Sequence, residues 1–356
     1  LSGLVGSEMC IRDSHNTGWH SFDSHPWDHP WLTPSNLTAM TIYSRNILEK
    51  VRKTAQTLPL NRSRYAFVCN IANSMYTSAS ALRASCHYID IFPHPSDNYL
   101  MSQPEWEEYD GYGVRGVDTL EEAVSKGLEL PEVSGVYRCP ATSQYINYDQ
   151  VSDFASESNL PLLRRLRSYD ALFAIQSPYL AYLSERPYIT THMGGDIWFE
   201  CSRNDQLGRL QRTAFRNSNL LIASNPWSFA FARRYGFKNL VCLPTLLEPT
   251  IYSPGPPDLR HEWANQIGGD FFVLTTARLD DLFKGSHRAL EGFKEFVDRC
   301  PSARLVVIGW GADSDRHFDS INAIGLEGKV IWRPPAGKKR LIRYLRSAHV
   351  LFCLLY

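Results

Sequence analysis

The sequence of 356 residues lacks a long apolar run, a net charge and any closely spaced pair of cysteines. No stretch approaches the roughly 18 apolar residues that a membrane-spanning helix needs, so nothing supports an integral membrane protein. Lys plus Arg and Asp plus Glu each number 37, and the missing basic excess argues against a nucleic-acid partner. The eight cysteines are scattered singly, which favours reduced thiols in a cytoplasmic protein.

Motifs for several common ligands are absent as well. The sequence contains neither the P-loop pattern nor the G-x-G-x-x-G fingerprint, so an ATPase or a dinucleotide-dependent enzyme gains no support. We expect no metal site, because the His and Asp residues near the start fit no standard ligand spacing and are interrupted by prolines. These residues are His20, Asp23, His25, Asp28 and His29.

The composition is that of a folded globular protein. Hydrophobic residues make up 44% and charged residues 21%, and the length suffices for two domains with their own cores. The opening residues 1–14 resemble a translated sequencing adapter, and we expect this leader to lie outside the fold. The fold is therefore read from residue 15 onward.

Short apolar strands alternate with helical patterns along most of the chain, which is typical of α/β proteins with parallel sheets. Two such series are separated by residues 244–258, where five prolines indicate a linker. The pattern predicts one Rossmann-like domain over residues 15–250 and a second over residues 251–356. Residues 93–150 are turn-rich and give no firm elements. Ligands of such sheets bind beyond the carboxyl ends of the strands.

The segment from Thr275 to Ser286 carries the clearest signal of a site. It lies where a predicted strand ends and a helix begins, and such a junction exposes backbone N–H groups that favour anions. Arg278 and Lys284 flank it, and a guanidinium fork together with an ammonium group suits a diphosphate. The alternative is two surface cations on a loop.

This segment resembles the group 1 glycosyltransferases of the GT-B fold, in which a strand is followed by Arg, a short loop and Lys-Gly. The likeness continues in the same order along the chain. The matching passages are Arg304–Gly309 with Gly311, Arg333-Pro-Pro, and Tyr344–Ala348, where His349 follows instead of the usual Asp. The resemblance implies two Rossmann-like domains whose parallel sheets face a cleft.

The resemblance also assigns roles in the second domain. It implies that Arg278, Lys284 and Gly285 bind the diphosphate of a nucleotide-sugar and stabilise the charge that develops on it during transfer. Gly309 and Gly311 would lie near the nucleotide. Such enzymes are usually retaining and need no metal, so the nucleotide-sugar is a co-substrate and no cofactor is expected.

In the first domain the resemblance points to the loop after a predicted strand. It implies catalytic roles for His192 and Asp196 and an acceptor-side role for Gly194 and Gly195. The family's usual His position is occupied here by Met193, and a one-residue step on a strand reverses the face. His192 is therefore either a residue of the active site or a buried structural histidine, and Asp196 either binds acceptor hydroxyls or caps the loop.

Two further segments have open alternatives. Asn73, Ser74 and Tyr76 follow the first predicted strand, where the fold places acceptor contacts, but Asn73 or Ser74 would also serve as a helix cap. The basic and apolar stretch at residues 162–167 indicates either peripheral contact with an anionic membrane or a solvated helix end.

The sequence thus predicts a glycosyltransferase with a nucleotide-sugar donor and a glycan, lipid-linked or small-molecule acceptor. We expect a cytoplasmic enzyme without a nucleic-acid partner, with peripheral membrane association as an open alternative. The family's paired-glutamate motif would follow the strand ending at Tyr356, so we expect the second domain to be incomplete and this chain to be inactive alone. The alternatives are a GT-B nucleotide-sugar epimerase and a nucleotide- or glycan-binding module without catalysis.

Overall fold

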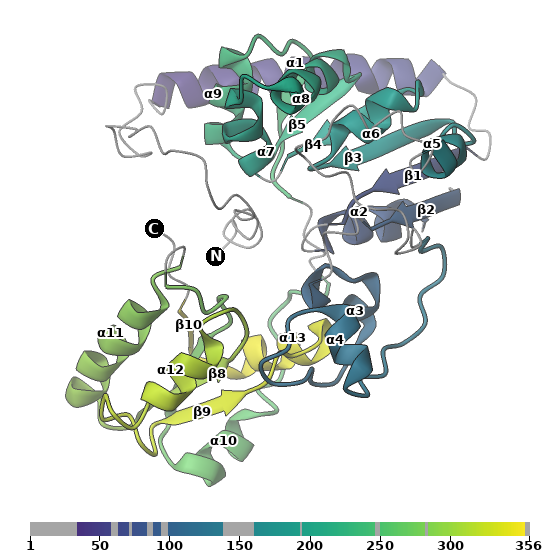
Figure 1. The fold of residues 1–356 in the computed structure, drawn as a ribbon. Helices are drawn as coiled ribbons and strands as arrows, with labels where there is room; N and C mark the ends of the chain where they lie inside the picture. The colour runs from purple at the N-terminus through teal and green to yellow at the C-terminus, as the bar shows by residue number, and fades with distance from the viewer. Residues whose placement is uncertain are drawn as a thin grey trace. The chain divides into compact units, whose positions relative to one another are not determined.

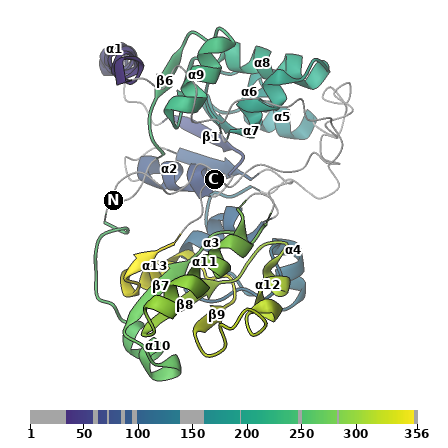
Figure 2. The ribbon, with the colours of Figure 1, turned by 90° about the vertical axis from the view of Figure 1, so that its left-hand side faces the viewer.

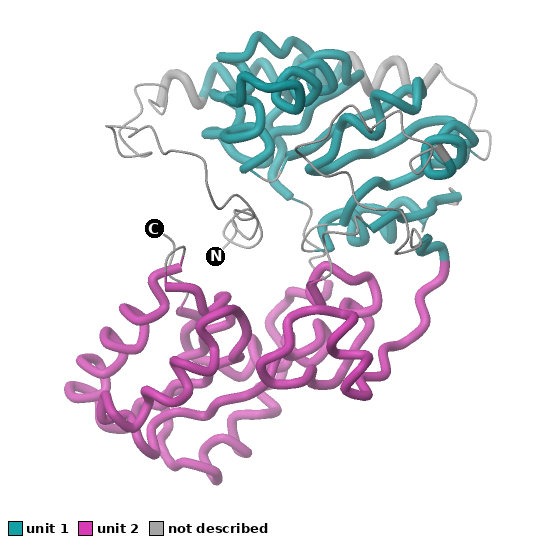
Figure 3. The backbone as a smooth tube through the Cα atoms, viewed as in Figure 1, with its two compact units in different colours: residues 1–97, 135–246 teal, residues 98–134, 247–356 magenta. Residues whose placement is uncertain are grey.

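The computed structural model describes residues 34–57, 63–70, 73–83, 88–93, 99–137, 160–192, 194–245, 250–281 and 284–352. The chain forms two compact units, residues 1–97 with 135–246 and residues 98–134 with 247–356 (Figure 3). Each unit contains one parallel sheet with helices around it (Figure 1). The predicted α/β class with two parallel sheets is therefore confirmed. The predicted leader, residues 1–14, lies outside the described residues.

The first unit is built on a six-stranded sheet with the strand order β2-β1-β3-β4-β5-β6. Its strands are β1 (Arg64–Val68), β2 (Tyr88–Phe92), β3 (Ala171–Ile175), β4 (Tyr188–Thr191), β5 (Leu220–Ala223) and β6 (Leu240–Cys242). Adjacent residues of one strand are buried together, as Ala66, Phe67 and Val68 are in β1. Such continuous burial explains why these strands read as unbroken apolar runs, since parallel sheets are covered on both faces.

The helices of the first unit begin with side-chain caps at two places that matter for its loops. Asp205 accepts a hydrogen bond from the Gly208 N–H, and Asn225 accepts one from the Ser228 N–H. The helices are α1 (Pro34–Thr57), α2 (Ser74–Arg83), α5 (Leu160–Leu166), α6 (Pro178–Leu183), α7 (Gly195–Trp198), α8 (Gln206–Asn217) and α9 (Pro226–Arg234), with the 3₁₀ turn η5 (Glu200–Ser202). None of the helices that the structure describes is long and apolar enough to cross a membrane.

The second unit has a four-stranded sheet with the strand order β10-β7-β8-β9. The elements are β7 (Phe271–Thr275), β8 (Ala303–Ile308), β9 (Val330–Arg333) and β10 (Val350–Leu351), with the helices α10 (Arg260–Ile267), α11 (Ser286–Arg299), α12 (Ser314–Ser320) and α13 (Lys338–Ser347). Val273 packs with Phe293 of α11, whereas Phe272 packs against Trp263 of α10, which in turn contacts Tyr344 of α13. Because neighbouring strand residues point to opposite faces, α11 lies on one face and α10 with α13 on the other (Figure 2).

Residues 98–134 belong to the second unit, although the sequence-based division places them in the first domain. This segment contains η3 (Leu100–Ser102), α3 (Pro104–Glu108) and α4 (Leu120–Ser125). It has its own small apolar cluster of Leu100, Trp106, Val117, Ala123 and Leu128. Because that cluster is assembled from short elements between turns, the spacing of apolar residues in the sequence does not predict it.

Candidate functional site

The loops that follow β7 and β8 are joined into one structure at the carboxyl edge of the second sheet. The Leu279 N–H donates to the Trp310 carbonyl oxygen at 2.8 Å, and the Asp313 N–H donates to the Leu279 carbonyl oxygen at 3.0 Å. The indole Nε1 of Trp310 donates to the Thr276 carbonyl oxygen at 3.0 Å. The Arg278 loop and the glycine turn of the sequence pattern therefore come together, at the edge where ligands of parallel sheets bind.

Two of the predicted glycines are required by this close packing. Gly311 has φ +108°, and a Cβ there would lie 2.7 Å from both Arg278 Cγ and the Leu279 carbonyl oxygen. A Cβ on Gly309 would lie 2.1 Å from Trp332 Nε1. Only glycine fits at both positions without displacement of its neighbours. The predicted role of these glycines beside a nucleotide stays a prediction.

Of the two predicted diphosphate ligands, Lys284 is buried and Arg278 is largely buried. Arg278 Nη2 lies 3.4 Å from Asp280 Oδ2, with the two side chains 13% and 10% exposed. Arg278 Nε has no hydrogen-bond partner among the described residues. Lys284 is 8% exposed and immediately precedes Gly285, whose φ of +57° turns the chain into α11. This burial argues against the alternative of two surface cations on a loop.

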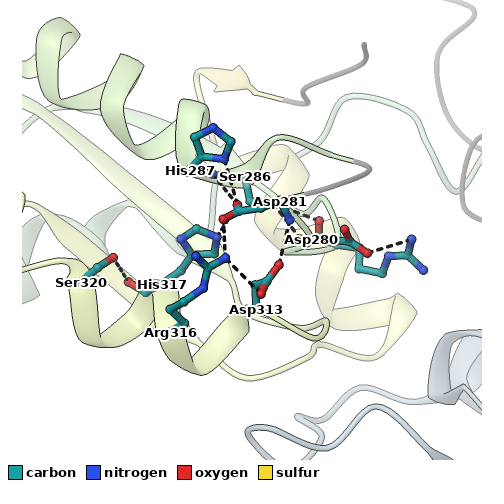
Figure 4. A network of polar contacts seen from close by, with 9 residues as sticks. Asp280, Asp281, Ser286, His287, Asp313, Arg316, His317 and Ser320 are labelled. Atoms are coloured by element: carbon teal, nitrogen blue, oxygen red, sulfur yellow. Dashed lines mark hydrogen bonds and ion pairs between the residues drawn. The ribbon is translucent and has the colours of Figure 1, made fainter. Parts of the chain in front are cut away.

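A network centred on Asp281 fixes the same loop (Figure 4). Its Oδ1 accepts from the His287 N–H at 2.8 Å and lies 2.8 Å from His317 Nε2, while Oδ2 accepts from Arg316. The Asp281 N–H donates to Asp313 Oδ2 at 2.8 Å. Burial raises the pKa of Asp281, but the His287 N–H, the Arg316 guanidinium and the His287 side chain together lower it to about 2. The loop is therefore anchored by a carboxylate that is ionised at neutral pH.

Sequence analysis did not identify this network. Asp281 stands next to Asp280 in the motif, but its partners His317 and Arg316 come from α12, more than 30 positions along the chain. No spacing rule links such distant residues in a single sequence.

In the first unit, His192 is buried at the end of β4. Its Nε2 accepts from the Ser224 N–H at 3.0 Å, a bond that ties the end of β4 to the end of β5. Nδ1 has no hydrogen-bond partner within the part of the chain that the structure describes. Burial lowers the pKa of His192 to about 3, so the ring is neutral over the physiological range. This environment suits the structural alternative, and a catalytic role for His192 stays a prediction.

Asp196 lies in the loop that follows. It is 3% exposed, and its Oδ1 accepts from the Ile197 N–H at 3.0 Å at the start of α7. Gly194, with φ +106°, and Gly195 form the turn into this helix. Burial and the neighbouring Asp196 raise the pKa of Glu200 to about 8. The loop therefore gathers acidic groups away from water. Helix α7 has Gly194 as its N-cap and no side-chain cap bond, so the contact of Asp196 with Ile197 is not a helix cap, and both roles considered for Asp196 stay predictions.

The acceptor-side residues predicted after β1 are organised by an asparagine that the sequence analysis did not single out. Asn70 Nδ2 donates to Asn73 Oδ1 at 2.6 Å, and Asn70 Oδ1 accepts from the Tyr76 N–H at 2.8 Å. Asn73 has φ +56°, and Ser74 begins α2. The three predicted residues thus lie in one buried turn at the carboxyl end of β1.

The stretch predicted for membrane contact forms α5. Leu163 and Leu166 are buried, whereas Arg164 and Arg165 are exposed, and the Arg165 guanidinium lies 4.7 Å from the Tyr137 ring centroid. Because these two leucines face the core, only charge is left to support membrane contact, which stays a prediction.

The structure places no group of three or more His, Cys, Asp or Glu side chains suitably for a metal ion in the ranges that it describes. His20, Asp23, His25, Asp28 and His29 lie outside those ranges.

No protein-family model and no curated protein sequence matches this chain. Solved structures do match it. Sucrose-phosphate synthase from Thermosynechococcus elongatus is 13% identical, with 83% of this chain and 77% of that chain covered and a TM-score of 0.57. HepE from Anabaena, solved with UDP and glucose, is 13% identical over 81% of this chain and 73% of that chain, with a TM-score of 0.53. WaaG, a glycosyltransferase of lipopolysaccharide biosynthesis, is 13% identical over 81% and 74%, with a TM-score of 0.51.

The chain has the GT-B fold. This confirms the fold class that the ordered series of motifs implied. In GT-B terms, the predicted residues of the second sheet, Arg278 with Gly309 and Gly311, come together in the structure. Those of the first sheet follow β1 and β4, two strands that β3 separates.

Proposed function

We propose that this GT-B protein is a glycosyltransferase that takes a sugar from a nucleotide-sugar and retains the configuration at the anomeric carbon. The observation that carries the proposal is the largely buried Arg278 packed against the glycine turn at the carboxyl edges of β7 and β8. Its Nε donor has no partner among the residues that the structure describes, and such a cation suits a diphosphate better than a solvated surface role. Structural likeness to the glycosyltransferase WaaG, and to HepE, which was solved with UDP and glucose, supports the use of a nucleotide-sugar.

The proposed chemistry is electrostatic. As the bond from the sugar to the nucleotide breaks, negative charge collects on the leaving diphosphate, and Arg278 and Lys284 stabilise it. Gly285 and the start of α11, a helix of 14 residues, add backbone N–H groups to the same diphosphate site. His192 and Asp196 would serve the acceptor, which is a glycan, a lipid-linked sugar or a small molecule. We place the enzyme in the cytoplasm, with contact to an anionic membrane through Arg164 and Arg165.

The test uses the purified protein and a panel of UDP-, GDP- and ADP-sugars, with transfer, hydrolysis and epimerisation measured separately. We expect transfer or slow hydrolysis of one donor class. Binding of a nucleotide-sugar without any turnover would favour the binding module instead, and interconversion of the sugar without transfer would favour an epimerase.

A further inference from the structure

A carboxylate from residues 98–134 occupies the glycine turn of the proposed diphosphate site. Both Oδ1 and Oδ2 of Asp118 lie 3.1 Å from the Gly311 backbone nitrogen and accept its N–H. Gly311 is the residue that packs against Arg278. The Asp118 carboxylate therefore already accepts the Gly311 N–H, at the place where the diphosphate of the nucleotide-sugar is proposed to bind.

The segment that carries Asp118 is held to the second unit by backbone pairing. Tyr112 and Ala336 form an antiparallel bridge. The Gly113 N–H donates to the Pro335 carbonyl oxygen at 2.7 Å, and the Gly337 N–H donates to the Gly111 carbonyl oxygen at 3.0 Å. These bonds hold the segment beside the loop between β9 and α13.

Charged side chains add a second set of contacts. The ammonium of Lys339 lies 2.9 Å from Glu108 Oε2. The guanidinium of Arg115 lies 3.6 Å from the Phe318 ring centroid and 3.2 Å from Asp315 Oδ1. Both ion pairs are exposed and each contributes little, so they offer little resistance to a local shift of the chain around Asp118, while the backbone bonds and the Trp106 cluster keep the rest of the segment docked.

The surroundings of Asp118 have opposing effects on the pKa of its carboxyl group. Burial has the largest effect and raises the pKa of this carboxyl group above the usual range, although the Gly311 N–H and the Arg278 charge act in the opposite direction. A half-buried carboxylate gains from a backbone N–H and a nearby cation, and these are the features that a phosphate group would use. The two anions cannot both accept the same N–H, and side by side they would repel each other.

We propose that Asp118 is a built-in competitor of the nucleotide diphosphate, so that binding of the sugar donor requires the carboxylate to leave Gly311. This inference rests on the proposed function and adds a device that sets the affinity for the donor. In the unliganded protein, Asp118 balances the charge of Arg278. When a diphosphate arrives, it takes the Gly311 N–H and Asp118 moves to solvent with its part of the segment.

The experiment measures binding of UDP, GDP and ADP by calorimetry to this chain, as wild type and as the variants Asp118→Asn, Asp118→Ala, Asp315→Asn and Arg278→Ala. Asp118→Asn keeps the size and an acceptor oxygen but removes the charge, and Asp118→Ala removes both. We expect the nucleotide that binds to do so about tenfold more tightly to Asp118→Ala, with Asp118→Asn between it and the wild type. Asp315→Asn removes an exposed ion pair of the same segment and should bind like the wild type.

The outcomes separate this inference from the proposed function. If Asp118→Asn and Asp118→Ala bind no more tightly than the wild type while Arg278→Ala loses binding, the diphosphate site stands and Asp118 is only structural. If Asp315→Asn tightens binding as much as Asp118→Ala, release of the segment matters and the carboxylate does not. If neither the wild type nor any Asp118 variant binds a nucleotide, both proposals are overturned. Circular dichroism of each variant confirms that it is folded.

Discussion

The candidate sites at the two sheets handle charge in opposite ways. In the second unit, ionised groups are paired with one another, and Asp281 is held as a carboxylate with a pKa of about 2 by His287 and Arg316. In the first unit, burial suppresses charge, so that His192 is neutral and the pKa of Glu200 is raised to about 8. The comparison indicates a division of labour, with the charged loops suited to a diphosphate and the neutral ones to hydroxyl groups of an acceptor.

Replacement of Arg278 should have the largest effect of the changes that test this comparison of the two sites. We expect Arg278→Ala to lower the proposed transfer reaction at least ~10²-fold, because one preorganised charge partner of the leaving group is lost. Arg278→Lys keeps the charge without the planar fork and should recover only part of the rate. The measurement is kcat/KM with the accepted nucleotide-sugar, and wild-type turnover by the alanine variant would remove Arg278 from the mechanism.

Gly311→Ala tests how tightly the glycine turn of the second unit packs against Arg278 and Leu279. The substitution combines a φ of +108° with a Cβ contact at 2.7 Å, and we expect it to destabilise the second unit by about 3 kcal/mol. Gly328→Ala is the matched control, because its φ is +66° and a Cβ there meets nothing within 4 Å. It should cost about 1 kcal/mol. Equal losses in urea unfolding would show that packing around Gly311 is loose.

Because of the Asp281 network, we expect the second unit to lose stability in acid. Since the pKa of Asp281 is about 2 when folded and roughly 3.9 when unfolded, its stabilisation is present above about pH 4 and is lost as the pH falls from 4 to 2. We expect Asp281→Asn to destabilise the second unit by about 1 to 3 kcal/mol at pH 7 and to flatten this acid dependence. Asp315→Asn, whose ion pair with Arg115 is exposed, should change neither.

The lowered pKa of His192 predicts that the stability of the first unit depends on pH over a different range. Its pKa is about 3 when folded and roughly 6.5 when unfolded, so the stability of the first unit should fall as the pH drops below 6.5, by roughly 1.4 kcal/mol per pH unit. His192→Gln should remove that slope. Hydrogen exchange of the β4 and β5 amides between pH 7.5 and 5.0 follows this unit separately, and an unchanged slope in the variant would exclude His192 as its origin.

The arrangement of the loops after β7 and β8 follows from a local sequence pattern, whereas the arrangement after β4 does not. Arg278, Lys284 and the glycines occur in a short local pattern, and the structure explains Gly311 by its contact with Arg278 itself. The roles of His192 and Asp196 depend on burial and on contacts such as that with Ser224, which is 32 positions away. Asp118 lies in the turn-rich stretch that gave no firm elements, and its partner Gly311 is 193 positions further along the chain.

The 98–134 segment also shapes how this protein is made. The chain passes between the two compact units three times, after residues 97, 134 and 246. During synthesis Tyr112 emerges 232 positions before Tyr344, the residue whose hydroxyl it meets in the folded protein. The ribosome needs at least about 12 seconds to add that many residues, and until residues 247–356 begin to emerge the segment depends on its own cluster around Trp106 to shield its apolar side chains. Substitutions in that cluster are therefore expected to lower the yield of folded protein before they alter the finished enzyme.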